Sequence, residues 1–199
     1  MPVSTATALV FAAVVAGRFI LPLFILRYPL PAIIACLVLD GIDQSIFQWL
    51  GHDPPGYQSY DKAMDVFYLA IAYLSTLRNW NSIAAFHVAW FLYFYRLIGV
   101  VLFELTQVRA LLLIFPNTFE YFFIAYEAIR TRWWVMVRSL RFWVGLAALI
   151  WVAVKLPQEF WIHVAEMDLT DTLLDHPWTL LVLVAPVVVV LTVVRVLVA

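Results

Sequence analysis

The sequence predicts an all-α protein, a polytopic transmembrane helix bundle of about seven spans with its N-terminus outside and its C-terminus inside the cell. Three observations support this fold class. Hydrophobic residues make up 65% of the chain and charged residues only 13%, too few polar groups to cover a soluble domain. Apolar segments of about 20 residues, the length that crosses a bilayer, recur along the chain. Pro, Gly, Asn and clustered charges separate these segments.

Seven segments have the length and hydrophobicity of a membrane-spanning helix. Their predicted bounds are 6–26, 32–50, 61–77, 83–105, 110–128, 142–156 and 178–198. The fourth and fifth would together make a helix too long for a bilayer, so a turn is expected at 107–109. Arg18 interrupts the first apolar stretch and no Lys or Arg precedes it, which favours a first span over a cleaved signal peptide. Because no internal repeat or break in composition is present, residues 1–199 are predicted to form a single domain.

The distribution of charge sets the predicted orientation. Four arginines lie between the fifth and sixth spans, whereas the next connection carries five acidic residues. Cytoplasmic loops are enriched in Lys and Arg, so the arginine-rich connection is assigned to the cytoplasm. The chain is thus predicted to be a multi-pass integral protein of the cell membrane, in contact with membrane lipids.

Composition also limits the classes of molecule that the chain is expected to bind. The basic residues are dispersed or lie at helix ends and the net charge is −1, so no nucleic acid is expected. Cys36 is the only cysteine, which excludes an intrachain disulfide and a cysteine-based metal site. The sequence is compatible with a homo-oligomer and with assembly of the chain with other membrane subunits.

The second and third spans carry polar side chains that recur at helical spacing. These are Asp40, Asp43 and Gln44 in the second span and Asp61, Asp65 and Tyr68 in the third. Residues three or four apart share one face of a helix. Ionised groups in hydrocarbon cost several kcal/mol each, so they are found facing one another, a counter-charge, a cation or water. Because the loop between these spans is short, the four carboxylates are expected to converge in one outward-facing pocket.

Simpler roles are open for the same aspartates. Asp61 can cap the start of the third helix, with Lys62 beside it in solvent. Asp40 and Asp43 can form a purely structural ion pair or a hydrogen bond between helices.

Two arginines inside apolar spans are candidate counter-charges, because a guanidinium cannot escape burial by losing its proton. Arg96, in the fourth span, is the preferred partner of an aspartate from the second or third span. Arg18, in the first span, either pairs with a carboxylate or extends to the lipid headgroups. His87 in the fourth span is either a proton relay or a packing residue among aromatic side chains.

The fifth span has its own polar stripe, formed by Asn117, Glu120 and Glu127. Pro116 precedes the stripe and removes a helical hydrogen bond, so either an irregularity at 115–120 or an ordinary proline kink is expected. Glu127 is expected in a solvated ion pair near Arg130 and Arg132.

The aspartates follow the pattern Asp40-x2-Asp43-x17-Asp61-x3-Asp65. This spacing resembles the metal-binding signature of the CDP-alcohol phosphotransferase family, small multi-span enzymes whose aspartates on two neighbouring helices hold divalent metals. The resemblance implies that these four residues bind Mg²⁺ or Mn²⁺ and support phosphotransfer on a lipid.

The resemblance is confined to the aspartates, about 26 residues of the chain by the spacing above. The family pattern has Gly after the second aspartate, then an Ala-Arg pair, then Gly four residues before the third aspartate. At these positions the present chain has Gln44, Phe47 with Gln48, and Tyr57. The missing glycines and arginine are the residues that would let a nucleotide approach.

Three functions fit these patterns. The favoured one is transport or conduction of protons, cations or a small solute, because closely spaced carboxylates share protons and a nearby arginine makes a switchable partner. Its predicted binding residues are Asp40, Asp43, Gln44, Asp65, Tyr68, Arg96, Asn117 and Glu120. The alternative is a membrane enzyme that uses Mg²⁺ or Mn²⁺ to act on a phospholipid or polyprenyl phosphate. In a third reading the chain is a noncatalytic subunit whose buried charges fix helix register.

Overall fold

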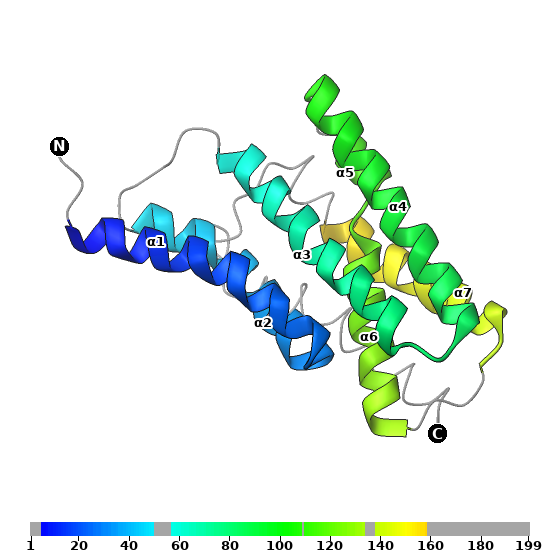
Figure 1. The fold of residues 1–199 in the computed structure, drawn as a ribbon. Coiled ribbons are helices and arrows are strands. Elements are labelled where there is room, and N and C mark those ends of the chain that lie inside the picture. Colours follow the sequence, from blue (N-terminus) through cyan, green and yellow to red (C-terminus); the bar gives the residue numbers. More distant parts are fainter. Residues whose placement is uncertain (1–4, 50–56, 109, 134–137, 159–199) are drawn as a thin grey trace. The chain divides into compact units, whose positions relative to one another are not determined.

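The computed structural model describes residues 5–49, 57–108, 110–133 and 138–158. All regular secondary structure within these ranges is helical, which confirms the predicted all-α class (Figure 1). The predicted seventh span, 178–198, lies outside the described residues. Packing divides the chain into two compact units, Met1–Asn79 and Trp80–Ala199. The single domain stays a prediction.

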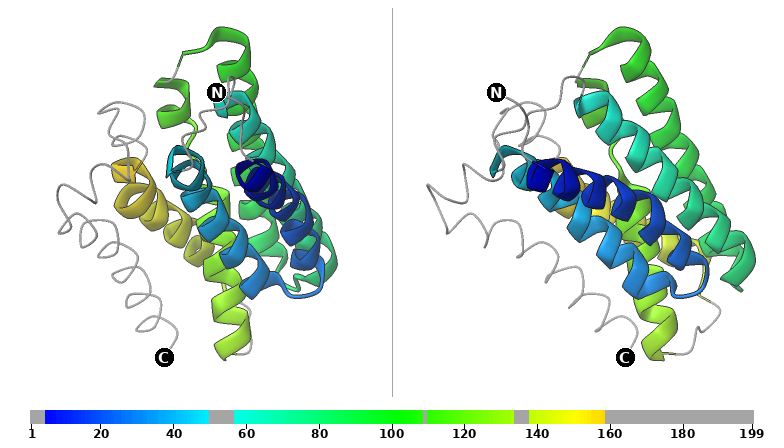
Figure 2. Two further views of the ribbon diagram at one scale, coloured as in Figure 1. Left: turned by 90° about the vertical axis from the view of Figure 1, so that its left-hand side faces the viewer. Right: turned by 60° about the vertical axis from the view of Figure 1, so that its left-hand side comes forward.

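Within the described residues, the first unit contains three long helices and one short 3₁₀ helix. In chain order they are α1 (Thr5–Ile20), the 3₁₀ helix η1 (Leu21–Leu26), α2 (Pro29–Trp49) and α3 (Tyr57–Asn79). Pro22 has no amide proton for an α-helical bond, and the chain tightens into η1 at this point. α1 and α2 lie side by side, joined at the η1 end (Figure 2). α1 and η1 match the first predicted span, and α2 and α3 the second and third.

The interior of this unit is apolar where η1, α2 and α3 meet. Ile25, Ile33 and Ala72 are fully buried there. The hydroxyl of Ser75 on α3 donates to the backbone oxygen of Ile25 at 3.3 Å. This bond satisfies a carbonyl group inside an otherwise apolar core and ties α3 to η1.

The second unit begins with a long helix followed by a helix that is interrupted. The elements described in this unit are α4 (Ile83–Thr106), α5 (Ala110–Ile114), α6 (Thr118–Trp133), α7 (Leu140–Ile150) and the π-helical turn η2 (Trp151–Lys155). Ser82 caps α4 by accepting a hydrogen bond from the amide of Ala85. α4 ends at Thr106, and the next residue, Gln107, adopts a left-handed conformation with φ 55°. The helix thus stops where the sequence predicts a turn, and α5 begins at Ala110.

The irregularity expected around Pro116 is also confirmed, and it is a complete break between α5 and α6. Two residues of α4 hold the carbonyl groups at this break. The Tyr95 hydroxyl donates to the backbone oxygen of Ile114 at 2.9 Å, and Nη1 of Arg96 donates to that of Phe115 at 3.0 Å. These donors replace the helical bonds that the break removes.

A glycine lets α4 come this close to the break. A Cβ atom added to Gly99 would lie 2.2 Å from Cβ of Phe115, far inside van der Waals contact. The fit depends on the lack of a side chain, so residue 99 is a point of close approach between α4 and the chain after α5.

Gly99→Ala is therefore expected to destabilise the protein by about 1–3 kcal/mol or more, since overpacking outweighs the roughly 1 kcal/mol that alanine gains over glycine in a helix. The matched control is Gly145→Ala on α7, where a Cβ would meet no atom within 4 Å. Thermal unfolding in detergent should give a lower Tm for the first variant and an equal or higher Tm for the second. Equal Tm values for both variants would contradict the close approach.

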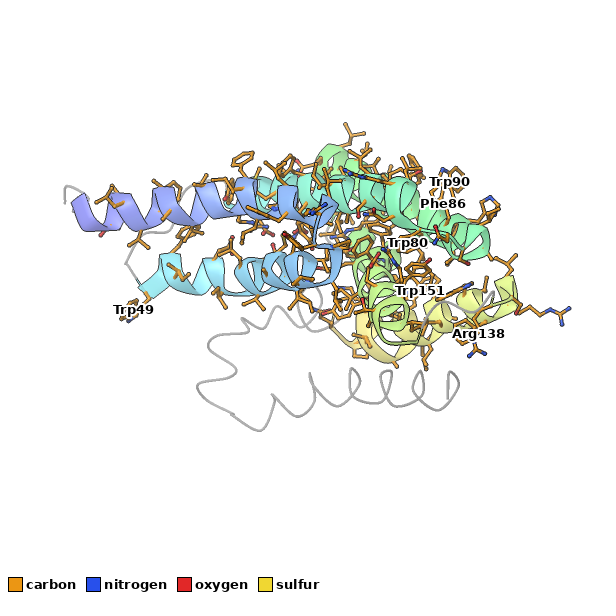
Figure 3. All side chains as sticks on the ribbon, turned by 60° about the horizontal axis from the view of Figure 1, so that its bottom comes forward. Trp49, Trp80, Phe86, Trp90, Arg138 and Trp151 are labelled. Carbon is orange, nitrogen blue, oxygen red and sulfur yellow. The ribbon has the colours of Figure 1, made fainter. Side chains whose placement is uncertain are left out.

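Three helical stretches within the described ranges are long and apolar enough to cross a membrane. They are Thr7–Leu26, Ile83–Thr106 and Leu140–Gln158. These stretches correspond to the first, fourth and sixth predicted spans. Large apolar side chains project from the helices: Trp49 at the end of α2 is 88% exposed and Trp90 on α4 is 49% exposed (Figure 3). Such exposure fits contact with lipid, and the count of seven spans and their orientation stay predictions.

Candidate functional site

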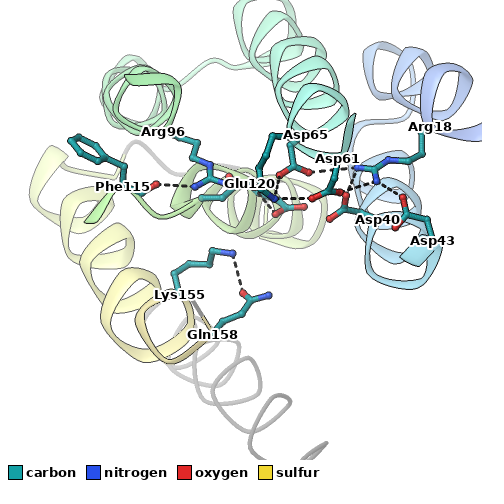
Figure 4. A network of polar contacts seen from close by, with 12 residues as sticks. Arg18, Asp40, Asp43, Asp61, Asp65, Arg96, Phe115, Glu120, Lys155 and Gln158 are labelled. Atoms are coloured by element: carbon teal, nitrogen blue, oxygen red, sulfur yellow. Dashed lines mark hydrogen bonds and ion pairs between the residues drawn. The ribbon is translucent and has the colours of Figure 1, made fainter. Parts of the chain in front are cut away.

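The guanidinium group of Arg18 lies among four aspartates of the first unit (Figure 4). Its Nη1 forms ion pairs with Asp43 and, at 3.1 Å, with Asp61. Its Nη2 pairs with Asp40 and, at 3.6 Å from the nearer oxygen, with Asp65. The Arg18 side chain is 3% exposed. Arg18 therefore pairs with carboxylates, and the alternative in which it extends to headgroups is wrong.

Helical spacing explains why the aspartates converge. Asp40 and Asp43 are three residues apart on α2, and Asp61 and Asp65 are four apart on α3, so each pair occupies one turn of its helix. α1 packs on both helices and brings Arg18 to them. α1 also runs close to α2 at the residue before Arg18, because a Cβ on Gly17 would lie 3.1 Å from Cδ2 of Leu39.

Lys62 is a second cation at the same place. Its Nζ lies 2.7 Å from Oδ2 of Asp61 and 3.6 Å from Oδ2 of Asp65. The Lys62 side chain is 16% exposed, so the solvated position considered for it from the sequence is wrong. The capping role of Asp61 is also wrong, because α3 begins four residues earlier, at Tyr57. The spacing of three residues between Lys62 and Asp65 is the signal that could have identified this pair.

We call the six charged residues the Asp/Arg18 cluster: Arg18, Asp40, Asp43, Asp61, Lys62 and Asp65. Its carboxylates outnumber its cations by two when all are ionised. Charges withdrawn from water are costly unless they are neutralised, so this excess favours uptake of protons or a cation. The ring of Tyr60 adds a cation–π contact, with its centroid 5.8 Å from Cζ of Arg18.

The four carboxylates of the cluster differ in how far their side chains are exposed to solvent. The side chains of Asp40 and Asp61 are 26% and 19% exposed, whereas those of Asp65 and Asp43 are 9% and 0% exposed. One oxygen each from Asp40, Asp61 and Asp65 lies within 4.8 Å of the other two, a separation that could hold a metal ion. Carboxylate oxygens are the ligands that Mg²⁺ and Mn²⁺ prefer.

Two further predicted site residues belong to the same unit. Gln44 follows Asp43 directly on α2. Tyr68 lies one turn after Asp65 on α3 and is buried.

The other predicted site residues, Arg96, Asn117 and Glu120, lie in the second unit and are all buried. Arg96 donates to the backbone oxygen of Phe115, as described above, and its expected pairing with an aspartate stays a prediction. Asn117 precedes α6 and accepts a hydrogen bond from the amide of Glu120 at 3.4 Å. Its Nδ2 in turn donates to Oε2 of Glu120 at 3.0 Å. The two side chains thus form a reciprocal cap at the start of α6.

Sequence reasoning missed the burial of two charged residues in this unit. Lys155 on η2 is 4% exposed, donates to Oε1 of Gln158 at 2.9 Å and lies 4.8 Å from the centroid of the Tyr121 ring. Glu127 pairs with Arg130 at 3.3 Å, as expected, but it is 3% exposed and therefore not solvated.

The indole of Trp80 explains why Glu127 can be buried. Its Nε1 donates to Oε1 of Glu127 at 2.8 Å, and its ring stacks on Tyr126 with a centroid separation of 3.7 Å. His87 on α4 is exposed and its ring lies 6.1 Å from the ring of Phe86, so packing among aromatic side chains and a proton relay both stay predictions.

No known protein family, curated protein or solved structure matches the chain. The similarity to the CDP-alcohol phosphotransferases therefore rests on the spacing of four aspartates, and the geometry of the Asp/Arg18 cluster carries the functional argument.

Proposed function

We propose that the chain is an integral membrane protein that moves protons or cations across the membrane, with the Asp/Arg18 cluster as the site that binds them. The excess of two carboxylates over cations in this cluster carries the proposal. Arg18 lies within the stretch Thr7–Leu26, which is apolar and long enough to cross a membrane. Ionisable residues placed inside such a stretch mark ion pathways more often than lipid-facing structure.

The cluster offers an incoming cation or proton carboxylates at different depths. Asp40 and Asp61 are the more exposed carboxylates, and Asp43 and Asp65 lie deeper. The negative charges repel one another, so a proton or cation that enters the cluster relieves this repulsion. Arg18 stays charged at any physiological pH and holds the carboxylates together while their protonation or occupancy changes.

Flux into liposomes tests this function. Vesicles that contain the wild-type protein should dissipate an imposed proton or cation gradient faster than protein-free vesicles prepared with the same lipids. A pH-sensitive dye reports protons, and ion-selective dyes report Na⁺, K⁺ and Mg²⁺ in parallel samples. Equal rates with and without protein for every ion would contradict transport.

One observation favours a divalent-metal-dependent membrane enzyme as the second candidate. It is the approach of Asp40, Asp61 and Asp65 oxygens to within 4.8 Å of one another. Mg²⁺ or Mn²⁺ held there would polarise the phosphate of a phospholipid or polyprenyl phosphate. This candidate requires that Mg²⁺ or Mn²⁺ raise the Tm of the detergent-solubilised protein and that phosphate or headgroup release depend on the metal. An unchanged Tm with no released product would eliminate it.

The role of a noncatalytic subunit makes a different prediction. Mild-detergent purification would then recover the chain with a stable membrane partner, and vesicles with the chain alone would show neither flux nor lipid chemistry.

A further inference from the structure

Three helix ends of the second unit meet around the ring of Tyr126. This ring belongs to the second half of α6 and stacks on Trp80, which lies just before α4 in the chain, with a centroid separation of 3.7 Å. It also lies 5.3 Å from the ring of Trp143, in the first turn of α7. The start of α4, the end of α6 and the start of α7 therefore lie together. We call this part of the second unit the α6/α7 end.

Arginines gather at the α6/α7 end. Arg130 lies in the last turn of α6, Arg138 lies just before α7, and Arg141 belongs to the first turn of α7. The acidic side chain that the structure describes beside them is Glu127, which Arg130 contacts at 3.3 Å. The other acidic residues described in this unit belong to the opposite ends of their helices: Glu104 on α4 and Glu120 on α6. Within the described residues, positive charge thus exceeds negative charge at the α6/α7 end.

Two of these arginines lie where a membrane span begins. α7 opens the stretch Leu140–Gln158, which is long and apolar enough to cross a membrane. Cζ of Arg138 lies 5.4 Å from the centroid of the Phe142 ring, and Arg141 is exposed. Arginines at the edge of an apolar span keep their guanidinium groups at the depth of the lipid headgroups.

The exposed face of α7 that continues from Arg141 is apolar. Arg141 and Val144 are three residues apart and share one face of the helix. Leu140 and Val144 are each 51% exposed, and Val152, two turns further along, is exposed as well. This face therefore presents guanidinium groups first and aliphatic side chains after them. A phospholipid has the same order, with its phosphate at the surface of the membrane and its acyl chains inside.

We propose that Arg138, Arg141 and the exposed face of α7 bind an anionic phospholipid, with its phosphate at the two guanidinium groups and its acyl chains along the helix. The planar guanidinium group matches the geometry of a phosphate, which it can contact through two parallel hydrogen bonds. Each arginine near the membrane surface favours a lipid of net negative charge, whereas a zwitterionic headgroup brings a positive charge of its own. The inference rests on the membrane position in the proposed function and is independent of transport.

Lipid binding by the full chain tests this inference. The protein in mild detergent is titrated with phosphatidylglycerol or with phosphatidylcholine of identical acyl chains, and native mass spectrometry counts the bound lipids. Wild type should bind its first phosphatidylglycerol with a Kd about tenfold or more below that for phosphatidylcholine. The preference should weaken as the ionic strength rises. Glycerol 1-phosphate has the phosphate without acyl chains, so at the same concentration it should not displace the lipid.

Paired substitutions locate the binding surface. The double variant Arg138→Gln/Arg141→Gln should bind phosphatidylglycerol with a Kd close to that for phosphatidylcholine, whose own Kd stays unchanged. Replacement of both residues by Lys should keep part of the preference, because the charge remains and the paired hydrogen bonds are lost. The control Arg27→Gln/Arg78→Gln removes two exposed arginines of the first unit and should keep the wild-type preference.

The outcomes separate this inference from the proposed function. The lipid surface is wrong if wild type binds both lipids equally, if Arg138→Gln/Arg141→Gln keeps the wild-type preference, or if the control loses it to the same extent. Displacement by glycerol 1-phosphate would show a phosphate site in place of a lipid surface. In each of these cases the liposome flux still decides transport. If the chain binds neither lipid, the membrane position fails, and both proposals fail with it. Should the double variant not fold, the three wild-type titrations decide alone.

Discussion

Arg18→Gln is expected to destabilise the protein by about 3–5 kcal/mol, the largest loss we predict for a single substitution. The guanidinium is the group that connects Asp40 and Asp43 on α2 with Asp61 on α3. Without it, shielded carboxylates face one another with less positive charge between them, and repulsion separates the helices. Thermal or denaturant unfolding in detergent measures the loss.

The controls identify the cause of that loss. Arg27→Gln removes an exposed arginine just after η1 and should change the stability by less than about 0.5 kcal/mol. Arg18→Lys keeps the charge but loses the fork that reaches several carboxylates, so it should fall between wild type and Arg18→Gln. Acidic buffer should narrow the difference between Arg18→Gln and wild type, because protonated carboxylates no longer repel. Equal stability of Arg18→Gln and wild type at neutral pH would show that the carboxylates do not depend on this arginine.

Hydrophobicity and length were sufficient to predict where α2, α3 and α4 lie. α2, α3 and α4 begin and end within about four residues of the predicted spans, a usual error for helix ends. The turn after α4 was predictable because the bilayer limits helix length, and the break before α6 because Pro116 cannot complete a helical bond. The helix positions, the turn and the break all follow from the residues of the segment concerned.

The convergence of the aspartates was also predictable, because spacings of three and four residues place side chains on one helical face. The arginine that pairs with them could not be predicted. Arg18 and Arg96 are both arginines inside apolar stretches, and the choice between them depends on how α1 packs against α2 and α3. Periodicity reports which face of a helix is polar and leaves open which other helix lies against it.

Burial of the remaining charged residues could not be read from the chain for a similar reason. Lys62 and Glu127 each have a neighbouring opposite charge that suggests a solvated pair. Packing from elsewhere shields them: Trp80, which precedes α4, donates to Glu127, which lies 47 residues later. Lys155 is buried beside the ring of Tyr121, which belongs to α6. Such shielding is a tertiary property.

Substitution of the deepest carboxylates is expected to abolish most of the transport. Asp43 is fully buried and pairs with Arg18, and Asp65 contacts both Arg18 and Lys62. Asn has nearly the same shape as Asp but carries no charge, so each replacement removes one of the two excess negative charges that favour ion uptake. The rate should fall by about tenfold or more, the loss that accompanies removal of about 1.4 kcal/mol of interaction. Glu104→Gln, an exposed carboxylate on α4, is the matched control.

The most direct test of the cluster as an ion-binding site is the initial rate of gradient dissipation in liposomes that contain equal amounts of folded wild type, Asp43→Asn, Asp65→Asn or Glu104→Gln. The account predicts that the wild type and Glu104→Gln dissipate a proton or cation gradient at the same rate, while both cluster variants approach the rate of protein-free vesicles. Wild-type rates in Asp43→Asn and Asp65→Asn, with their Tm values intact, would contradict it.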